Sequence, residues 1–314
     1  MKKWLTCMAA LLAATLLHAQ QYGVVNLSVC NLRATPEYDA EMVSQALLGT
    51  PVHILAVNPG NDWPKVQTPD TYTGWVHKEG ITLLSKEEYS AWNAAPKVIV
   101  TALFGVVKEK ASDRSATLSD VVAGDRLRDL GASGRFLRVG FPDGRVGYIT
   151  RRDAAPEDRW RRCLDQSADA IISTALSMQG FPYLWAGMSP KGTDCSGFVR
   201  AVLFMHDIII PRDASQQAPK GERIEGLDHL EKGDLVFFGR REPDRTRVSH
   251  VGIYIGDGRF IHSLGRVKVA SFRKDDPLFD AYNTGRYLFA SRILPHIDRE
   301  DGLNTTLTNP YYAE

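Results

Sequence analysis

The sequence predicts a mixed α+β domain in the C-terminal half of the chain, preceded by two small all-β units. Three observations support this fold class. From residue 23 to about 155, short apolar runs alternate with turn clusters, which is typical of short strands joined by tight turns. Within that region one pattern occurs twice. From about residue 158 the apolar residues recur at helical spacing, and strand-like runs return only later, an order typical of an α+β domain.

The composition is that of an ordinary globular protein. The 314 residues are 44% hydrophobic and 24% charged, and the formal net charge is +1. A chain of this length is expected to hold about two domains. Because it carries no basic field, the sequence favours neither nucleic acid nor an anionic membrane as a partner. The oligomeric state is left open.

Residues 1–19 are expected to form a signal peptide. Lys2 and Lys3 provide the basic start, residues 8–17 the apolar stretch, and Ala19 the small residue before the cleavage site. The apolar stretch is too short to span a bilayer, and no later stretch reaches the roughly 20 apolar residues of a membrane helix. We therefore expect an exported protein, periplasmic or secreted, with no membrane attachment after signal cleavage.

Export would place the cysteines where disulfides can form. The mature chain would carry Cys30, Cys163 and Cys195, so at least one must lack a partner within the chain. Cys7 lies before the apolar run of the leader rather than after it, which disfavours its use as a lipidation site. Cys30 and Cys163 are expected to be buried thiols, and whether either forms a disulfide is left open.

The two all-β units are expected at residues 21–86 and 95–156, with a short helix-compatible connection between them. The stretch 62–76 resembles 134–149, since an aromatic residue, Val, Pro-Asp and Gly-aromatic recur at matching positions. This pattern resembles bacterial SH3-like barrels. The resemblance implies either binding of peptides or cell-wall polymer, or a scaffold that packs against the next domain, and both remain open.

The α+β domain is expected at residues 158–296, followed by a poorly anchored tail at 297–314. Residues 158–180 carry apolar residues at helical spacing and end at a glycine. A second helix is expected from Cys195 to about residue 206, and strand-like runs follow it.

Cys195 lies where this second helix is expected to begin. Asp194 is a good N-cap, and the positive end of the helix dipole would stabilise a thiolate at Cys195, the reactive form of cysteine. The carboxylate of Asp194 acts in the opposite sense because like charges repel. Use of Cys195 as a nucleophile therefore requires a nearby cation, most simply a protonated histidine.

His250 and His262 lie on two consecutive predicted strands, in SHVGIYIGDGRFIHS. A histidine base needs a third polar group to hold its orientation, and His262 could supply it for His250. A simple two-residue turn at Asp257 and Gly258 would put the two side chains on opposite faces. A longer loop or a one-residue bulge puts them on the same face, so a catalytic triad predicts an irregular hairpin.

Three blocks together resemble the signature of the NlpC/P60 cysteine peptidases: PYLWAG with GTDCSGFV, then LEKGDLVFF, then HVGIYIGDGRFIHS. They follow the family's order and span about residues 182–263. The resemblance implies a papain-like fold and cleavage of peptide bonds in bacterial cell-wall peptides. It also implies these roles: Cys195 as nucleophile, His250 as general base and acid, His262 as its orienting residue, and Tyr183 as an oxyanion donor.

Two SH3-like units before such a domain resemble the YkfC-like subgroup, the γ-D-glutamyl-L-diamino acid endopeptidases. This implies murein peptides with a free N-terminal L-Ala as substrates, such as L-Ala-γ-D-Glu-diaminopimelate. The implied substrate-binding residues are Asp194, Ser196 and Ser215 in the catalytic domain, and Glu41 and Tyr72 in the first barrel. Because an ammonium group needs a carboxylate partner, we expect Asp194 to oppose the thiolate until the substrate amine pairs with it.

Two other functions remain open at this point. The domain could hydrolyse intact, polymeric peptidoglycan, or the chain could be a non-catalytic wall-binding adaptor with a degenerate catalytic domain. The cysteines and histidines show no zinc-finger spacing, and a thiol mechanism needs no metal or other cofactor. The sequence does not distinguish diaminopimelate from lysine as the third residue of the peptide.

Overall fold

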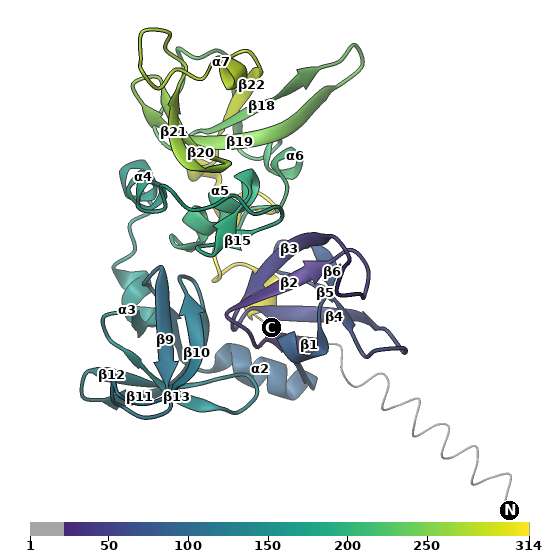
Figure 1. Ribbon diagram of the computed structural model, residues 1–314, viewed down its shortest axis with the longest axis vertical. Helices are drawn as coiled ribbons and strands as arrows, with labels where there is room; N and C mark the ends of the chain where they lie inside the picture. The colour runs from purple at the N-terminus through teal and green to yellow at the C-terminus, as the bar shows by residue number, and fades with distance from the viewer. Residues whose placement is uncertain (1–21, 314) are drawn as a thin grey trace, which may run out of the picture.

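The structure, a computed structural model, describes residues 22–313, so the predicted signal peptide lies outside the described residues. Two small β units and a mixed α+β domain follow one another along the chain (Figure 1). The large sheet of the α+β domain lies at the opposite end of the molecule from the second β unit. No helix in residues 22–313 is long and apolar enough to cross a membrane.

The first barrel is a seven-stranded antiparallel sheet around a small apolar core that includes Val25, Leu32 and Val66. Its elements are β1 (Tyr22–Val25), β2 (Val29–Arg33), β3 (Met42–Leu47), β4 (Pro51–Val57), β5 (Pro64–Gln67), β6 (Thr73–Trp75), η1 (Lys78–Gly80) and β7 (Ile81–Leu84). The strands lie in the order β3-β2-β6-β5-β4-β1-β7.

The second barrel repeats this arrangement. Its strands are β8 (Lys97–Val100), β9 (Phe104–Lys108), β10 (Thr117–Val122), β11 (Arg126–Ser133), β12 (Phe136–Gly140), β13 (Val146–Thr150) and β14 (Ala154–Pro156). They lie in the order β10-β9-β13-β12-β11-β8-β14, which is the order of the first sheet shifted by seven strands. The internal repeat is therefore confirmed, since 62–76 and 134–149 form corresponding hairpins, β5–β6 and β12–β13.

The connection between the barrels is the helix α2 (Lys86–Ala94). Ser85 and Glu88 form a reciprocal capping box at its start. Tyr89 and Trp92, three residues apart on one face, are buried against the first barrel beside Val24. The helix therefore holds the linker against the first barrel.

The α+β domain is built on a six-stranded sheet in the order β17-β22-β18-β19-β20-β21. Its core includes Phe198, Phe237 and Ile253, where α5 packs on β19 and β20. Its elements are α3 (Glu157–Arg162), α4 (Ala168–Ser177), β15 (Met188–Ser189), β16 (Gly192–Thr193), α5 (Cys195–Phe204), α6 (Ala214–Gln217), β17 (Glu222–Ile224), β18 (Leu235–Arg241), β19 (Thr246–Gly256), β20 (Arg259–Leu264), β21 (Arg266–Ser271), α7 (Ala281–Thr284), β22 (Tyr287–Arg292), η2 (Leu294–His296) and α8 (Pro310–Ala313).

The single helix predicted at 158–180 is wrong, because this stretch forms two helices, α3 and α4. Ser167 caps α4 by accepting a bond from the backbone N–H of Ala170, so it starts a new helix. Cys163 ends α3 and is exposed, contrary to the expected buried thiol, whereas Cys30 is buried as expected. Both are free thiols.

The expectation of a poorly anchored tail is also wrong. Residues 297–313, called the C-terminal segment below, return from the catalytic domain to the first barrel. Asn309 donates to the carbonyl of Pro69 at 2.9 Å, and the Tyr311 hydroxyl donates to Gln67 at 2.8 Å. The Tyr311 ring also stacks on His53, with centroids 4.1 Å apart. The polar side chains that suggest a solvated tail thus serve in contacts between units.

Candidate active site

Cys195 is the first residue of α5, as predicted. The Asp194 carboxylate caps this helix by accepting from the backbone N–H of Gly197 at 2.7 Å. Gly197 in turn allows a close approach of the preceding loop, because a Cβ there would lie 1.9 Å from the carbonyl oxygen of Gly187. The sequence GTDCSGF therefore fixes the helix start, and with it the position of the sulfur.

The two histidines lie on one face of the hairpin β19–β20. Gly256 pairs with Arg259 across the turn, but the register shifts between Tyr254 and Gly256, which marks a bulge. The bulge brings His250 Nε2 to 2.8 Å from His262 Nδ1. The predicted irregular hairpin is therefore confirmed, and Nδ1 of His250 is the ring nitrogen that remains for the cleft.

Burial controls the protonation of the candidate pair. It raises the pKa of the Cys195 thiol to about 11, and the Asp194 carboxylate adds to this rise, while a backbone bond from Val251 acts in the opposite sense. Burial also lowers the pKa of His250 to about 3, with a further contribution from His262. Burial of each group thus favours the uncharged thiol and the uncharged imidazole.

Tyr183 is a hydrogen-bond donor close to the sulfur. Burial raises the pKa of its hydroxyl to about 12, and the negative charge of Cys195 is the next largest cause. Its backbone N–H donates to the carbonyl of Gly265 at 3.0 Å, which ties the loop to the β20–β21 turn. A hydroxyl that stays protonated can donate to an oxyanion formed beside Cys195.

A cleft of about 420 Å³ passes between the catalytic domain and the first barrel. His262 does not line it, being fully buried behind His250. All the other predicted site residues do: Glu41, Tyr72, Tyr183, Asp194, Cys195, Ser196, Ser215 and His250. In residues 22–313, no three His, Cys, Asp or Glu side chains gather in a way that could hold a metal ion.

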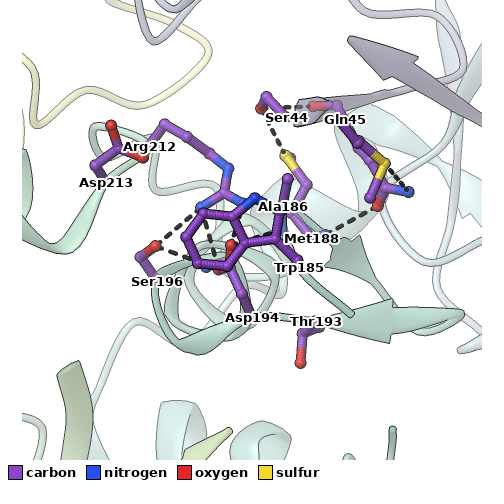
Figure 2. Close-up of polar contacts among 12 residues, drawn as sticks. Ser44, Gln45, Trp185, Ala186, Met188, Thr193, Asp194, Ser196, Arg212 and Asp213 are labelled. Atoms are coloured by element: carbon purple, nitrogen blue, oxygen red, sulfur yellow. Dashed lines mark hydrogen bonds and ion pairs between the residues drawn. The ribbon is translucent and has the colours of Figure 1, made fainter. Parts of the chain in front are cut away.

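Arg212 is a residue of this site that the sequence analysis missed. Its guanidinium donates to both carboxylate oxygens of Asp194, at 2.5 and 3.1 Å, and to Ser196 Oγ at 2.9 Å (Figure 2). The backbone N–H of Ala186 also donates to Asp194, at 3.0 Å. Asp194 therefore has a cationic partner within the chain, although its carboxylate still raises the pKa of the Cys195 thiol more than Arg212 lowers it. The sequence indicates this role only weakly, because Arg212 is a single arginine in a loop between two helices.

Trp185 is a second missed residue, and it joins the two units at the cleft. Its indole N–H donates to Glu41 of the first barrel at 3.0 Å. Nearby, Gln45 of the barrel accepts from the backbone N–H of Met188 at 2.9 Å (Figure 2). An aromatic residue two positions after Tyr183 was the available signal, and it pointed equally to packing. These bonds place Glu41 at the rim of the cleft beside the catalytic domain, where Glu41 and Trp185 both stay exposed to solvent.

Ala186 adopts a left-handed backbone conformation, with φ of 60°. Glycine adopts this conformation without steric cost, whereas for alanine it costs on the order of 1 kcal/mol. Ala186 holds this conformation while its backbone N–H donates to Asp194 at 3.0 Å.

Comparison with known proteins identifies two regions of the chain. Residues 180–284 match the NlpC/P60 family, and residues 32–81 match the bacterial dipeptidyl-peptidase SH3 domain. The first range contains Cys195 and both histidines, and the second contains Glu41 and Tyr72.

Two of the similar curated proteins come from Bacillus cereus and Lysinibacillus sphaericus. The chain is 33% identical over 231 residues to a γ-D-glutamyl-L-lysine dipeptidyl-peptidase of Bacillus cereus, covering 71% of this chain and 67% of that protein. It is 29% identical over 268 residues to dipeptidyl-peptidase 6 of Lysinibacillus sphaericus, covering 82% and 94%. A crystal structure of an NlpC/P60 family protein from Bacillus cereus superposes with a TM-score of 0.74 at 26% identity, covering 87% of this chain and all of that one.

Proposed function

The chain belongs to the NlpC/P60 family of cysteine peptidases, and we propose that it hydrolyses the bond between γ-D-glutamate and the diamino acid in murein peptides with a free N-terminal L-Ala. Two similar proteins support this class of substrate through their names, γ-D-glutamyl-L-lysine dipeptidyl-peptidase and dipeptidyl-peptidase 6. Release of a dipeptide from the N-terminal end is the reaction that both names describe.

In this proposal, Cys195 attacks the γ-carbonyl carbon of D-glutamate while Nδ1 of His250 accepts the thiol proton. His262 holds His250 through the 2.8 Å contact between their ring nitrogens. The Tyr183 hydroxyl and the backbone N–H of Cys195 donate to the oxyanion. His250 then protonates the leaving amine, and water attacks the thioester to release L-Ala-D-Glu and regenerate the thiol.

One observation carries the preference for a free amine, namely the charge at the barrel end of the cleft. Glu41, Asp194 and Asp213 line the cleft together with Arg212, which pairs with Asp194, while Arg286, which also lines it, bonds Ser249 next to His250. The excess of carboxylate favours an ammonium group. Because Trp185 and Glu41 bond across this end, a peptide extended beyond its N-terminal L-Ala would have to break that contact.

Digestion of two matched peptides tests the proposal. L-Ala-γ-D-Glu-diaminopimelate should yield L-Ala-D-Glu by mass spectrometry, and the same peptide with an acetylated amine should lose at least about 100-fold in kcat/KM because it lacks the charge. The Cys195→Ala variant should cut neither peptide. Equal rates on both peptides would contradict the free-amine preference, and activity retained by Cys195→Ala would contradict the thiol mechanism.

A further inference from the structure

A second cavity continues the cleft on the side away from the first barrel. It has a volume of about 460 Å³ and is lined by Arg240, Arg247, Ser249, Tyr282 and Arg286. Three of these, Ser249, Tyr282 and Arg286, also line the cleft that contains Cys195. The two spaces therefore form one continuous groove, and the part lined by the three arginines is called the basic groove below.

The arginines of the basic groove carry no internal counter-charge. Arg240 and Arg247 are directly opposite each other on β18 and β19, a pairing that is unfavourable for like charges. In residues 22–313, neither they nor Arg286 has a carboxylate within 4.0 Å. Arg245, at the tip of the same hairpin, is by contrast paired with Glu242 at 2.8 Å. Arg240 and Arg247 thus lack the carboxylate partner that Arg245 has.

Arg286 is held at the junction of the two spaces. Its guanidinium donates to Ser249 Oγ at 2.7 Å and lies 4.7 Å from the centre of the Tyr282 ring. Ser249 immediately precedes His250 in β19. The groove therefore begins next to the residue that protonates the leaving amine in the proposed reaction.

The direction of the substrate follows from the two ends. Carboxylates line the barrel end of the cleft and would hold the N-terminal ammonium, so the residue released as the amine must extend past His250. That path leads into the basic groove. The charges along the whole groove thus match a peptide that is cationic at its N-terminus and anionic at its other end.

We propose, resting on the proposed function, that the basic groove binds the side-chain carboxylate of the leaving diamino acid, so that the enzyme selects diaminopimelate over lysine. A guanidinium binds a carboxylate through two parallel hydrogen bonds, and Arg240 and Arg247 supply two such groups from directly opposite positions on neighbouring strands. The lysine side chain ends in an ammonium alone, which the same arginines repel. Diaminopimelate carries a carboxylate beside its ammonium.

Three peptides of one length test this inference: L-Ala-γ-D-Glu followed by diaminopimelate, by diaminopimelate amidated at its side-chain carboxyl, or by lysine. The parent enzyme should cut the first with a kcat/KM at least about tenfold above the other two. In the double variant Arg240→Gln/Arg247→Gln these ratios should fall toward one. Arg245→Gln, which changes a paired arginine outside the groove, should keep the parent ratios.

Two results would overturn the inference: ratios near one in the parent, or ratios that the double variant leaves unchanged. Binding to Cys195→Ala, measured by calorimetry at low salt, separates this inference from the proposed reaction. If the enzyme cleaves none of the three peptides, the proposed function is contradicted. Calorimetry would still show whether the basic groove binds the diaminopimelate peptide. The triple variant Cys195→Ala/Arg240→Gln/Arg247→Gln should bind the diaminopimelate peptide at least about tenfold more weakly than Cys195→Ala alone. Equal affinities of these two variants would refute binding of the carboxylate by the basic groove.

Discussion

Replacing Arg212 by methionine is expected to destabilise the catalytic domain by about 3–5 kcal/mol, the cost of leaving a buried charge without its partner. The Arg212 side chain is 1% exposed and that of its partner Asp194 is 9% exposed. The guanidinium makes two bonds to this carboxylate and one to Ser196 Oγ. Methionine replaces the apolar part of the arginine side chain but supplies none of these donors.

The magnitude depends on what remains around the carboxylate. After the substitution, Asp194 keeps the backbone N–H groups of Gly197 and Ala186, at 2.7 and 3.0 Å, and the Ser196 hydroxyl at 3.3 Å. Three neutral donors do not replace a cation in a buried site, so the loss should fall in the range of a broken buried pair rather than of one hydrogen bond. The double variant Asp194→Asn/Arg212→Met should lose less than the sum of the single losses, with a coupling energy of about 2–3 kcal/mol.

Amide hydrogen exchange in α5 is the suitable assay, because three units need not unfold together and one global free energy would mix them. The free energy of opening for the α5 amides should fall by the stated amount in Arg212→Met. Arg273→Met is the matched control, since Arg273 and Asp275 form an exposed pair expected to contribute about 0–1 kcal/mol. If Arg212→Met costs no more than this control, the ion pair is not what stabilises the start of α5.

Three further predictions concern other parts of the site. Gly197→Ala should lower the opening free energy of the α5 amides by at least about 2 kcal/mol, because the new Cβ collides with the Gly187 carbonyl. In an ordinary helix the same change stabilises by about 1 kcal/mol, so an increase in the opening free energy would refute the collision. Since the lowered pKa keeps His250 in its neutral, basic form at acid pH, the acid limb of kcat/KM should lie below about pH 5, and a limb near 6.5 would contradict this. Tyr311→Ala should raise KM for free-amine peptides several-fold with a smaller change in kcat, because it removes the contact with Gln67 that holds the first barrel. An unchanged KM would show that this contact does not position the barrel for substrate binding.

Matched variants separate these effects from general damage. Ala201→Gly, in the same helix, should cost only the ordinary propensity difference of about 1 kcal/mol. Tyr311→Phe keeps the ring that stacks on His53 and removes the hydroxyl, so its effect on KM should lie between those of the parent and Tyr311→Ala.

The parts of the site that could be predicted from the sequence are those set by short-range patterns. A helix cap at Asp194 defines where Cys195 lies, and strand alternation with one bulge defines which face His250 and His262 share. The repeat of 62–76 in 134–149 likewise predicts two units of one topology.

The parts that could not be predicted depend on partners far apart in the chain. Trp185 meets Glu41 across 144 positions, and Arg212 meets Asp194 from a loop with no periodic pattern. Periodicity and capping report the state of one segment, but not which distant segment completes its hydrogen bonds. The C-terminal segment shows the same limit, since its polar composition is compatible with a solvated tail and with a contact between units.

The C-terminal segment makes the order of synthesis matter for this protein. The Tyr89 hydroxyl donates to the carbonyl of Tyr311, 222 positions later, so the ribosome makes the first barrel well before the residues that fasten it. Cys195 and both histidines are translated before that fastening exists. Until this segment is made, the first barrel lacks the bonds from Asn309 and Tyr311, and the catalytic core lacks Leu303. We therefore expect the cleft between the two units to reach its final shape only after residues 303–311 have left the ribosome.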